Sequence, residues 1–221
     1  MKKRIFFKLI FLQLVFMSCN GQQANEKLLP KNNPIVGGGC DGCELMYIGI
    51  PKELHATDTS PGWNEKGQKL IVSGTVFQLD QKTPAPNVII YYWQTDNAGY
   101  YSPTQKMDER VKRHGHIRGW VKTDKNGKYT IKTVRPAPYP NDVLPAHIHL
   151  SIKEPDVANE YYTDEINFED DKLLTAHFKK YPQEKRGGSG VVKIKVKDGV
   201  QITTHNIVLG LNIPNYPKKI R

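Results

Sequence analysis

Two histidines and a nearby tyrosine form the stretch of this sequence with the clearest chemical potential. His147 and His149 flank Ile148 at the start of an apolar run that predicts a β-strand. Residues two apart on a strand point to the same face, so both imidazoles can approach one metal ion while Ile148 packs on the other face. Tyr139 lies upstream on a proline-rich loop and is a candidate third ligand. The spacing therefore predicts a metal site.

Each of these signals, taken alone, has an alternative interpretation. A His-x-His pair on a strand is as compatible with two surface histidines as with a metal pair. Tyr139 and Tyr101 are two of 11 tyrosines, and either is typical of an aromatic residue packed in a turn. A second pair, His114 and His116, follows a charged run, and we expect solvated loop residues there, with substrate contact as the alternative.

The elements that must position these residues are short strands separated by turns. The predicted strands cover residues 70–77, 87–93, 119–123, 128–133, 147–152 and 160–168, followed by 191–196 and 200–209. We expect hairpins around Asn126-Gly127 and Asp198-Gly199, and a single amphipathic helix over residues 170–180. This pattern predicts an all-β fold, a β-sandwich of short, mainly antiparallel strands with one short helix and long loops.

The order of motifs along the chain resembles that of the intradiol ring-cleavage dioxygenases, the family of protocatechuate 3,4-dioxygenase and catechol 1,2-dioxygenase. The motifs are Trp93-Gln94 at the end of a strand, Thr-Asp-x-x-Gly-x-Tyr at 123–129, Pro-x-Pro-Tyr-Pro at 136–140 and Pro-Ala-His-Ile-His at 145–149. The resemblance runs from about residue 70 to residue 168. It implies a non-haem Fe(III) centre with four protein ligands, namely Tyr101, Tyr139, His147 and His149. Tyr101 fits better than Tyr100, because the family tyrosine lies eight positions after the tryptophan.

This ligand set suits the chemistry that the resemblance implies. Two tyrosinates are hard anionic oxygens that favour ferric over ferrous iron, and two imidazoles complete the set. A catechol can then chelate the iron, and O2 cleaves the bond between its two oxygenated carbons to give a muconate-type diacid. By resemblance Tyr139 is the catalytic residue, because substrate displaces this tyrosinate and gives it a proton. No organic cofactor is expected.

Two positions depart from the family pattern, and both concern the substrate pocket. Leu144 stands where most members carry an arginine that stabilises negative charge on the ring. Arg113, Arg118 and Arg135 are the candidates to replace that charge. Glu165 stands where a pocket glutamine usually lies, and its carboxylate favours a neutral catechol over an anionic one. The leucine also keeps an alternative open, an iron- or catechol-binding surface lipoprotein without turnover.

The first residues predict export and lipid attachment. A basic head at residues 2–4 precedes an apolar run at 5–17, which is shorter than the roughly 20 residues that span a bilayer. We therefore predict a lipoprotein signal peptide at 1–18, with lipid on Cys19 as the membrane anchor. An ordinary signal peptide with an incidental cysteine is the alternative. The predicted location is the periplasm, the outer membrane or the cell surface.

The rest of the chain divides into three predicted parts: a flexible tether at 19–45, the sandwich at 46–212 and a basic tail at 213–221. The tether carries Cys40 and Cys43. Because Cys19, the one other cysteine, is assigned to lipid and export leads to an oxidising compartment, a disulfide between them is favoured over a redox pair or a zinc site.

The net charge is +10, and the signal peptide carries four of the basic residues and no acidic ones, which leaves +6. Lys and Arg are interspersed with acids instead of clustered, so no nucleic-acid partner is predicted. The expected partners are a small aromatic diol, O2 and the membrane that holds the anchor. No oligomeric state is predicted.

Overall fold

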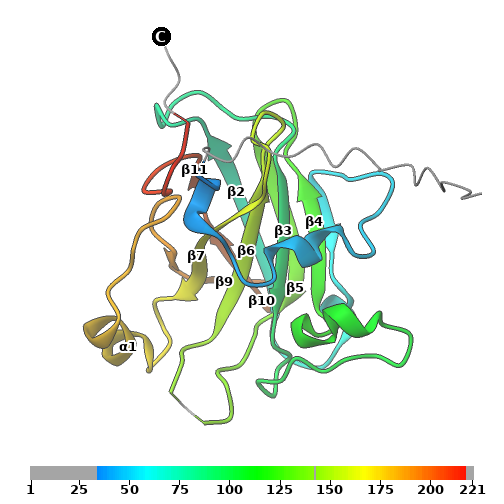
Figure 1. Cartoon of the computed structure of the whole chain (residues 1–221). Helices are drawn as coiled ribbons and strands as arrows, with labels where there is room; N and C mark the ends of the chain where they lie inside the picture. The colour runs from blue at the N-terminus through cyan, green and yellow to red at the C-terminus, as the bar shows by residue number, and fades with distance from the viewer. Residues whose placement is uncertain (1–33, 142, 218–221) are drawn as a thin grey trace, which may run out of the picture. The chain divides into compact units, whose positions relative to one another are not determined.

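The computed structural model describes residues 34–141 and 143–217, and the chain from Pro34 onward forms one compact unit. Figure 1 shows two β-sheets, and the main apolar core draws its residues from both. One sheet contains β1 (Thr57–Thr59), β2 (Lys69–Phe77), β5 (Lys128–Val134), β9 (Lys195–Lys197), β10 (Val200–Thr204) and β11 (Ile207–Val208). The other contains β3 (Ile89–Gln94), β4 (Arg118–Lys122), β6 (His147–Lys153), β7 (Tyr161–Phe168) and β8 (Val191–Val192).

Short helical elements complete the described part of the chain. These are the α-helix α1 (Leu174–Lys180) and the 3-10 helices η1 (Val36–Gly38), η2 (Cys43–Tyr47), η3 (Pro61–Asn64) and η4 (Glu109–His114). In the ranges that the structure covers, no helix combines the length and the apolar character that a membrane span requires. The predicted all-β sandwich with one short helix is confirmed, although its two sheets mix antiparallel and parallel pairings.

The main core shows why β6 can present two histidines to one side. Ile148, Leu150 and Ile152 are fully buried between the sheets. Side chains on a strand alternate between its faces, so His147 and His149 must lie on the outer face of the five-stranded sheet. The apolar residues of β6 thereby fix the direction of both imidazoles.

A smaller apolar cluster covers the outer face of the same sheet. Tyr91 and Trp93 of β3 lie outside the main core and pack with Met46 of η2. The indole of Trp120 donates a hydrogen bond of 2.7 Å to the Met46 carbonyl. Segment 40–47 therefore forms a cover over β3 and β4 (Figure 1).

The boundaries of the predicted parts differ from the structure at two places. Residues 34–45, expected in the tether, belong to the compact unit because the buried Cys43, Leu45 and Met46 need a partner surface. In the expected tail, Ile213 is buried and Tyr216 donates a hydrogen bond of 2.8 Å to Glu154. The signal peptide, Cys19, residues 19–33 and residues 218–221 lie outside the described residues.

The first predicted hairpin is wrong, and the second is confirmed only next to its turn at Asp198-Gly199. Segments 119–123 and 128–133 lie in different sheets, because β4 pairs with β3 whereas β5 pairs with β2. In the last predicted hairpin only β9 and β10 pair with each other, whereas β8 joins β7 and β11 joins β2. Local turn residues predict a reversal of the chain, but the buried apolar faces decide which sheet each strand joins.

The helix also begins later than the predicted residue 170. The Asp171 carboxylate accepts hydrogen bonds of 2.8 Å from the backbone N–H groups of Leu173 and Ala146. This carboxylate stabilises a turn at residues where the first turn of the helix was predicted. It also ties the chain before α1 to the residue that precedes His147, so the short helix helps to fix the start of β6.

We expect the Ile148→Ala substitution to lower the free energy of unfolding by about 2–5 kcal/mol, because it leaves a cavity between the sheets. Denaturant unfolding measures this difference. The matched control, Val196→Ala, truncates a side chain that is 68% exposed and should change the value by less than about 0.5 kcal/mol. A loss below about 1 kcal/mol for Ile148→Ala would contradict the assigned core position.

Candidate active site

Two tyrosine hydroxyls from two loops and two histidine nitrogens from one strand meet on the outer face of the five-stranded sheet. The Tyr101 hydroxyl lies 2.8 Å from the Tyr139 hydroxyl and 2.9 Å from Nε2 of His149. Nε2 of His147 lies 3.3 Å from the Tyr139 hydroxyl and 3.1 Å from Nε2 of His149. We call these four residues the quartet. The structure thus brings together all four residues that the sequence singled out.

The polar contacts behind the two imidazoles determine which nitrogens face the centre of the quartet. Nδ1 of His147 lies 2.7 Å from the Pro145 carbonyl, which only accepts, so Nδ1 carries the proton. Nδ1 of His149 lies 3.6 Å from the Glu165 carboxylate. With protons on the Nδ1 side, both Nε2 atoms present lone pairs to each other, and a cation between them would relieve that repulsion.

The chemistry of this donor set fits one hard metal ion. Two phenol oxygens and two imidazole nitrogens match the preferences of ferric iron better than those of zinc. Within the described ranges, no group of three or more His, Cys, Asp and Glu residues is placed to hold a metal. Any metal site built on the quartet therefore requires the tyrosines.

The two tyrosine-bearing loops are joined by backbone contacts. The Ala137 N–H donates a hydrogen bond of 3.1 Å to the Asp96 carbonyl, and the Thr95 hydroxyl donates one of 2.8 Å to the Ala137 carbonyl. Gly99 has φ +86°, and a Cβ there would lie 2.1 Å from the Pro138 carbonyl oxygen. Only glycine permits this approach, which sets the separation of Tyr101 and Tyr139.

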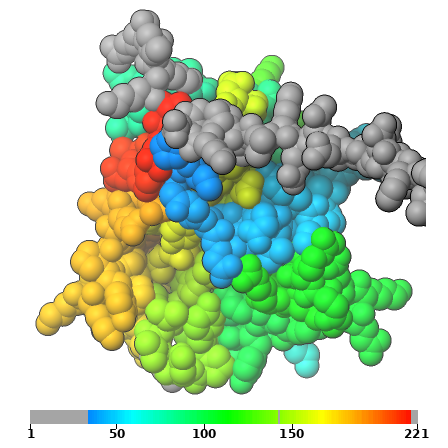
Figure 2. All heavy atoms as spheres, in the orientation of Figure 1, coloured from blue at the N-terminus to red at the C-terminus, as the bar shows by residue number. Residues whose placement is uncertain are grey.

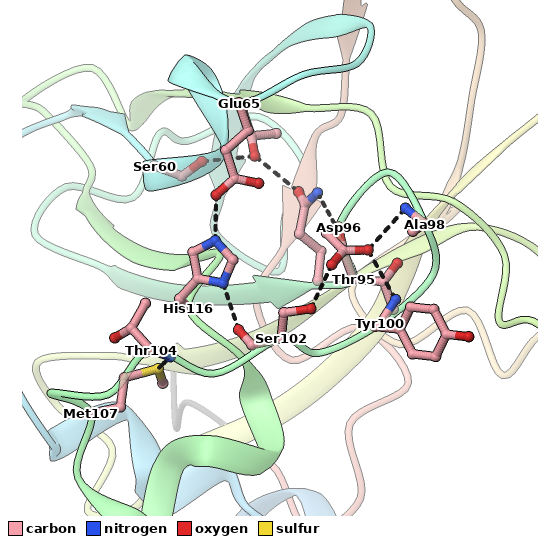
Figure 3. A network of polar contacts seen from close by, with 12 residues as sticks. Ser60, Glu65, Thr95, Asp96, Ala98, Tyr100, Ser102, Thr104, Met107 and His116 are labelled. Carbon is pink, nitrogen blue, oxygen red and sulfur yellow. Dashed lines mark hydrogen bonds and ion pairs between the residues drawn. The ribbon is translucent and has the colours of Figure 1, made fainter.

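A polar network supports the Tyr101 loop from behind. Figure 3 shows His116 between Glu65 and Ser102, with Ser102 in turn reaching Asp96. Both His116 nitrogens face acceptors, namely the Ser102 carbonyl and the Glu65 carboxylate. Burial opposes the charged imidazole, but these two acceptors outweigh it and raise the pKa of His116 above its usual value. The residue after Tyr101 is thereby held in place.

A β-bulge and a cross-strand pair place His149. The register between β6 and β7 shifts between Ile148 and Leu150, so two residues of β7 face one of β6 and Glu165 comes near His149. On the other side His149 pairs directly with Trp93 of β3, and their rings stack with centroids 4.8 Å apart. The imidazole is therefore fixed by neighbours on both strands.

A pocket of about 380 Å³ opens beside the quartet. Tyr101, Tyr139 and His149 line it together with Trp93 and Glu165. The remaining lining comes from segment 39–41, from η4 and from β7, and consists of Gly39, Cys40, Asp41, Arg113, His114 and Tyr162. Figure 2 shows the N-terminal segment, in blue, against the green residues on this face. The sequence prediction included Glu165 and named Arg113 as a candidate, but it missed the wall formed by residues 39–41 and Tyr162.

The predicted cysteine pair shapes one of these walls. Cys40 and Cys43 are joined by a disulfide. The Asp41 carboxylate inside this short loop accepts hydrogen bonds of 3.0–3.1 Å from the Arg113 guanidinium. This contact joins the loop to η4 at the edge of the pocket.

The interpretation of His114 as a solvated loop residue was wrong. His114 is only 4% exposed, and its ring stacks on Trp93 with centroids 4.2 Å apart and an interplanar angle of 4°. His116 is half-buried in the network behind Tyr101. The sequence signal that could have found them is weak, because the partners Trp93 and Glu65 are distant in the chain and join them only after folding.

The structure also shows where Leu144 and the three candidate arginines lie. Leu144 is half-buried and is not among the described residues that line this pocket. Of the three arginines considered, Arg113 reaches the lining. Arg118 instead lies over Trp120, 4.9 Å from the ring centre, and Arg135 lies over Phe168 at 3.7 Å.

Burial favours the uncharged forms of Tyr101, Tyr139 and His147. It raises the pKa of Tyr101 well above the usual phenol value and also raises that of Tyr139. It lowers the pKa of His147 to about 4. A bound cation reverses this preference at the phenols, because it stabilises the phenolates. The phenols thus keep their protons without a cation and would lose them to bind one.

The His116–Glu65 pair should make a pH-dependent contribution to stability. A raised pKa in the folded state means that the contribution is complete below the unfolded value of about 6.5 and is lost as pH rises through the folded value. We expect Glu65→Gln to cost about 0.5–1 kcal/mol more at pH 5.5 than at pH 8.5, an estimate reduced for partial exposure. Urea unfolding at both pH values measures the difference.

The control for this pair is Glu109→Gln, which removes the partner of Lys112 at an 84% exposed site and should show no such pH dependence. An equal cost of Glu65→Gln at both pH values would contradict the charged pair.

The sequence of this chain is similar to those of known dioxygenases. Catechol 1,2-dioxygenase of Acinetobacter baylyi is 30% identical over 124 residues, covering 49% of this chain and 39% of that protein. The protocatechuate 3,4-dioxygenase beta chain of Burkholderia cepacia is 30% identical over 92 residues, covering 39% of each. This chain therefore matches less than half the length of these two curated relatives.

Solved structures show the same fold. The catechol 1,2-dioxygenase of Acinetobacter sp. ADP1 has a TM-score of 0.56 at 24% identity, covering 73% of this chain and 58% of that one. The dioxygenase domain of a carbohydrate-binding fusion from Streptomyces sp. SirexAA-E has a TM-score of 0.54 at 23% identity, covering 72% of this chain and 91% of that one. The dioxygenase family model matches residues 50–209, well over half of the chain. The chain therefore belongs to the intradiol ring-cleavage dioxygenase family.

Proposed function

We propose that this protein is an Fe(III)-dependent intradiol dioxygenase, which cleaves a catechol-type diol with O2 to a muconate-type diacid. The observation that carries the proposal is the convergence of two phenol oxygens and two imidazole nitrogens within 2.8–3.3 Å of their neighbours. Family membership supports the same reaction class. In the net reaction the bond between the two oxygenated carbons breaks, and both atoms of O2 enter the two new carboxylic groups.

The residues of the quartet would hold the metal, and Tyr139 would in addition accept a proton. A ferric ion held by these residues would bind both diol oxygens and supply the redox chemistry by which O2 reacts with the ring. Tyr139 is the proton acceptor for a diol hydroxyl, because its contact to His147 is the longest of the four and it lies on a loop. Tyr101 and His149, by contrast, are held by the network around His116 and by the stack on Trp93.

The pocket favours an uncharged aromatic diol. Its volume of about 380 Å³ holds one substituted aromatic ring, and Trp93 gives it an aromatic wall. The Glu165 carboxylate near His149 contributes negative charge on one side. The charge of Arg113 on the other side is compensated by Asp41. An anionic substituent therefore gains little attraction at this pocket.

Substitution of the quartet should separate iron binding from turnover. We expect the iron-loaded protein to consume O2 with catechol, Tyr139→Phe to keep iron but lose at least tenfold in kcat/KM, and His149→Ala to lose iron together with activity. Oxygen uptake, metal analysis and mass spectrometry of the product made under labelled O2 provide the measurements. Tyr181→Phe alters a tyrosine that is 52% exposed and outside this pocket, and should behave as wild type.

The same assay distinguishes the alternative function. A spectral change on addition of catechol without O2 consumption would support an iron- or catechol-binding surface protein without turnover. Normal turnover by both quartet variants would show that the ligands are assigned wrongly.

We also propose that the protein is exported and anchored by lipid on Cys19. The support is the sequence before that cysteine and the Cys40–Cys43 disulfide, which agrees with an oxidising compartment. In bacterial cells fed labelled palmitate, we expect label in the wild-type protein and none in Cys19→Ala, which should leave the membrane fraction. Label that persists in Cys19→Ala would contradict the anchor.

A further inference from the structure

His114 is a buried histidine outside the quartet, and one of its two ring nitrogens, Nε2, has no assigned role. Its Nδ1 lies 2.8 Å from the Tyr91 hydroxyl, and the same hydroxyl accepts a hydrogen bond of 3.1 Å from the Arg118 guanidinium. Tyr91 is fully buried, so its hydroxyl proton needs an acceptor. Since arginine only donates, the Tyr91 proton goes to Nδ1 of His114. Nε2 of His114 must then carry the ring proton.

This Nε2–H is a donor without a partner at the wall of the substrate pocket. No described residue accepts a hydrogen bond from it, and His114 belongs to the pocket lining. Gly42 of the disulfide loop lies close by, where a Cβ would come within 3.0 Å of Nε2. The same Cβ would lie 2.5 Å from Nη2 of Arg113, so only glycine lets the disulfide loop pack against both side chains. Burial also lowers the pKa of His114 to about 3, so the ring is neutral.

The location of His114 relative to the quartet defines what it can contact. Its ring lies parallel to Trp93, and Trp93 in turn stacks on His149, so His114 lies two stacking steps from the quartet. The edge of Trp93 lines the pocket between them. A diol whose hydroxyls reach the quartet would extend along Trp93 and bring a substituent on the far side of its ring to Nε2 of His114.

The charges around this end of the pocket select the kind of substituent. Arg113 is next to His114, but two of its nitrogens bind Asp41 at 3.0–3.1 Å and its charge is compensated. Glu165 is negative on the opposite wall. A neutral N–H donor in this setting matches an uncharged oxygen acceptor better than a carboxylate.

We propose that His114 contacts the substrate and determines specificity, donating its Nε2–H to an uncharged carbonyl or ether oxygen carried by the diol ring opposite its hydroxyls. The proposal rests on the proposed function and narrows its substrate class to catechols with such an oxygen. Tyr91 and Arg118 are positioning residues, because they fix the tautomer without touching the substrate.

The test compares two ligands of nearly the same shape, 3,4-dihydroxyacetophenone with the carbonyl and 4-ethylcatechol without it. Affinities of the iron-loaded protein are measured under nitrogen by calorimetry, so turnover is not required. We expect His114→Phe, which keeps an aromatic ring against Trp93, to reduce the preference for the carbonyl ligand about three- to tenfold. His55→Phe makes the same exchange at an exposed residue outside this pocket and should leave the preference unchanged.

Further measurements separate the possible failures. His114→Gln restores an N–H donor and should recover part of the preference, which also provides a second variant if His114→Phe does not fold. A third ligand, 3,4-dihydroxybenzoate, should bind wild type more weakly than the acetophenone. Catechol turnover with an unchanged ligand preference in His114→Phe would overturn the role of His114 alone. Absence of any diol binding by wild type would overturn both this inference and the proposed function.

Discussion

The site depends on the repulsion between lone pairs that the fold forces together. Nε2 of His147 and Nε2 of His149 lie 3.1 Å apart, although neither gains from facing the lone pair of the other, and the two phenol hydroxyls contact them at 2.9 and 3.3 Å. A sandwich core on one side and two joined loops on the other prevent them from separating. A cation is the simplest partner that converts this repulsion into binding, and the polar contacts behind the imidazoles already orient them for it.

The site is built from one β-strand and two loops. The histidines come from β6, whose buried isoleucines and leucine set their direction. The tyrosines come from loops, which need other means of support: the glycine contact at Gly99, the backbone bonds between the loops and the network centred on His116. The histidines are therefore fixed by the sheet, and the tyrosines by contacts between their loops.

The pocket wall formed by the disulfide loop connects the start of the compact unit to the site. Asp41 compensates Arg113, and Gly42 lets the loop pack closely against Arg113 and against Nε2 of His114. The stack of His114, Trp93 and His149 then extends from this wall to the quartet. Residues from three separate segments thereby set both the charge and the hydrogen-bonding character of the space open to a diol.

The sequence by itself determined the sandwich class, most strands and the common face of His147 and His149, because strand alternation and turn motifs are local properties of the chain. The two tyrosines of the quartet were indicated only by the resemblance of the motif order to that of a known family. It did not determine which sheet β4, β5, β8 and β11 would join, since that depends on which apolar edges meet after collapse. Nor did it show that His114 would be buried beside Trp93, or that Arg113 instead of Arg118 or Arg135 would reach the pocket. Those contacts join residues distant in the chain, and only tertiary packing brings them together.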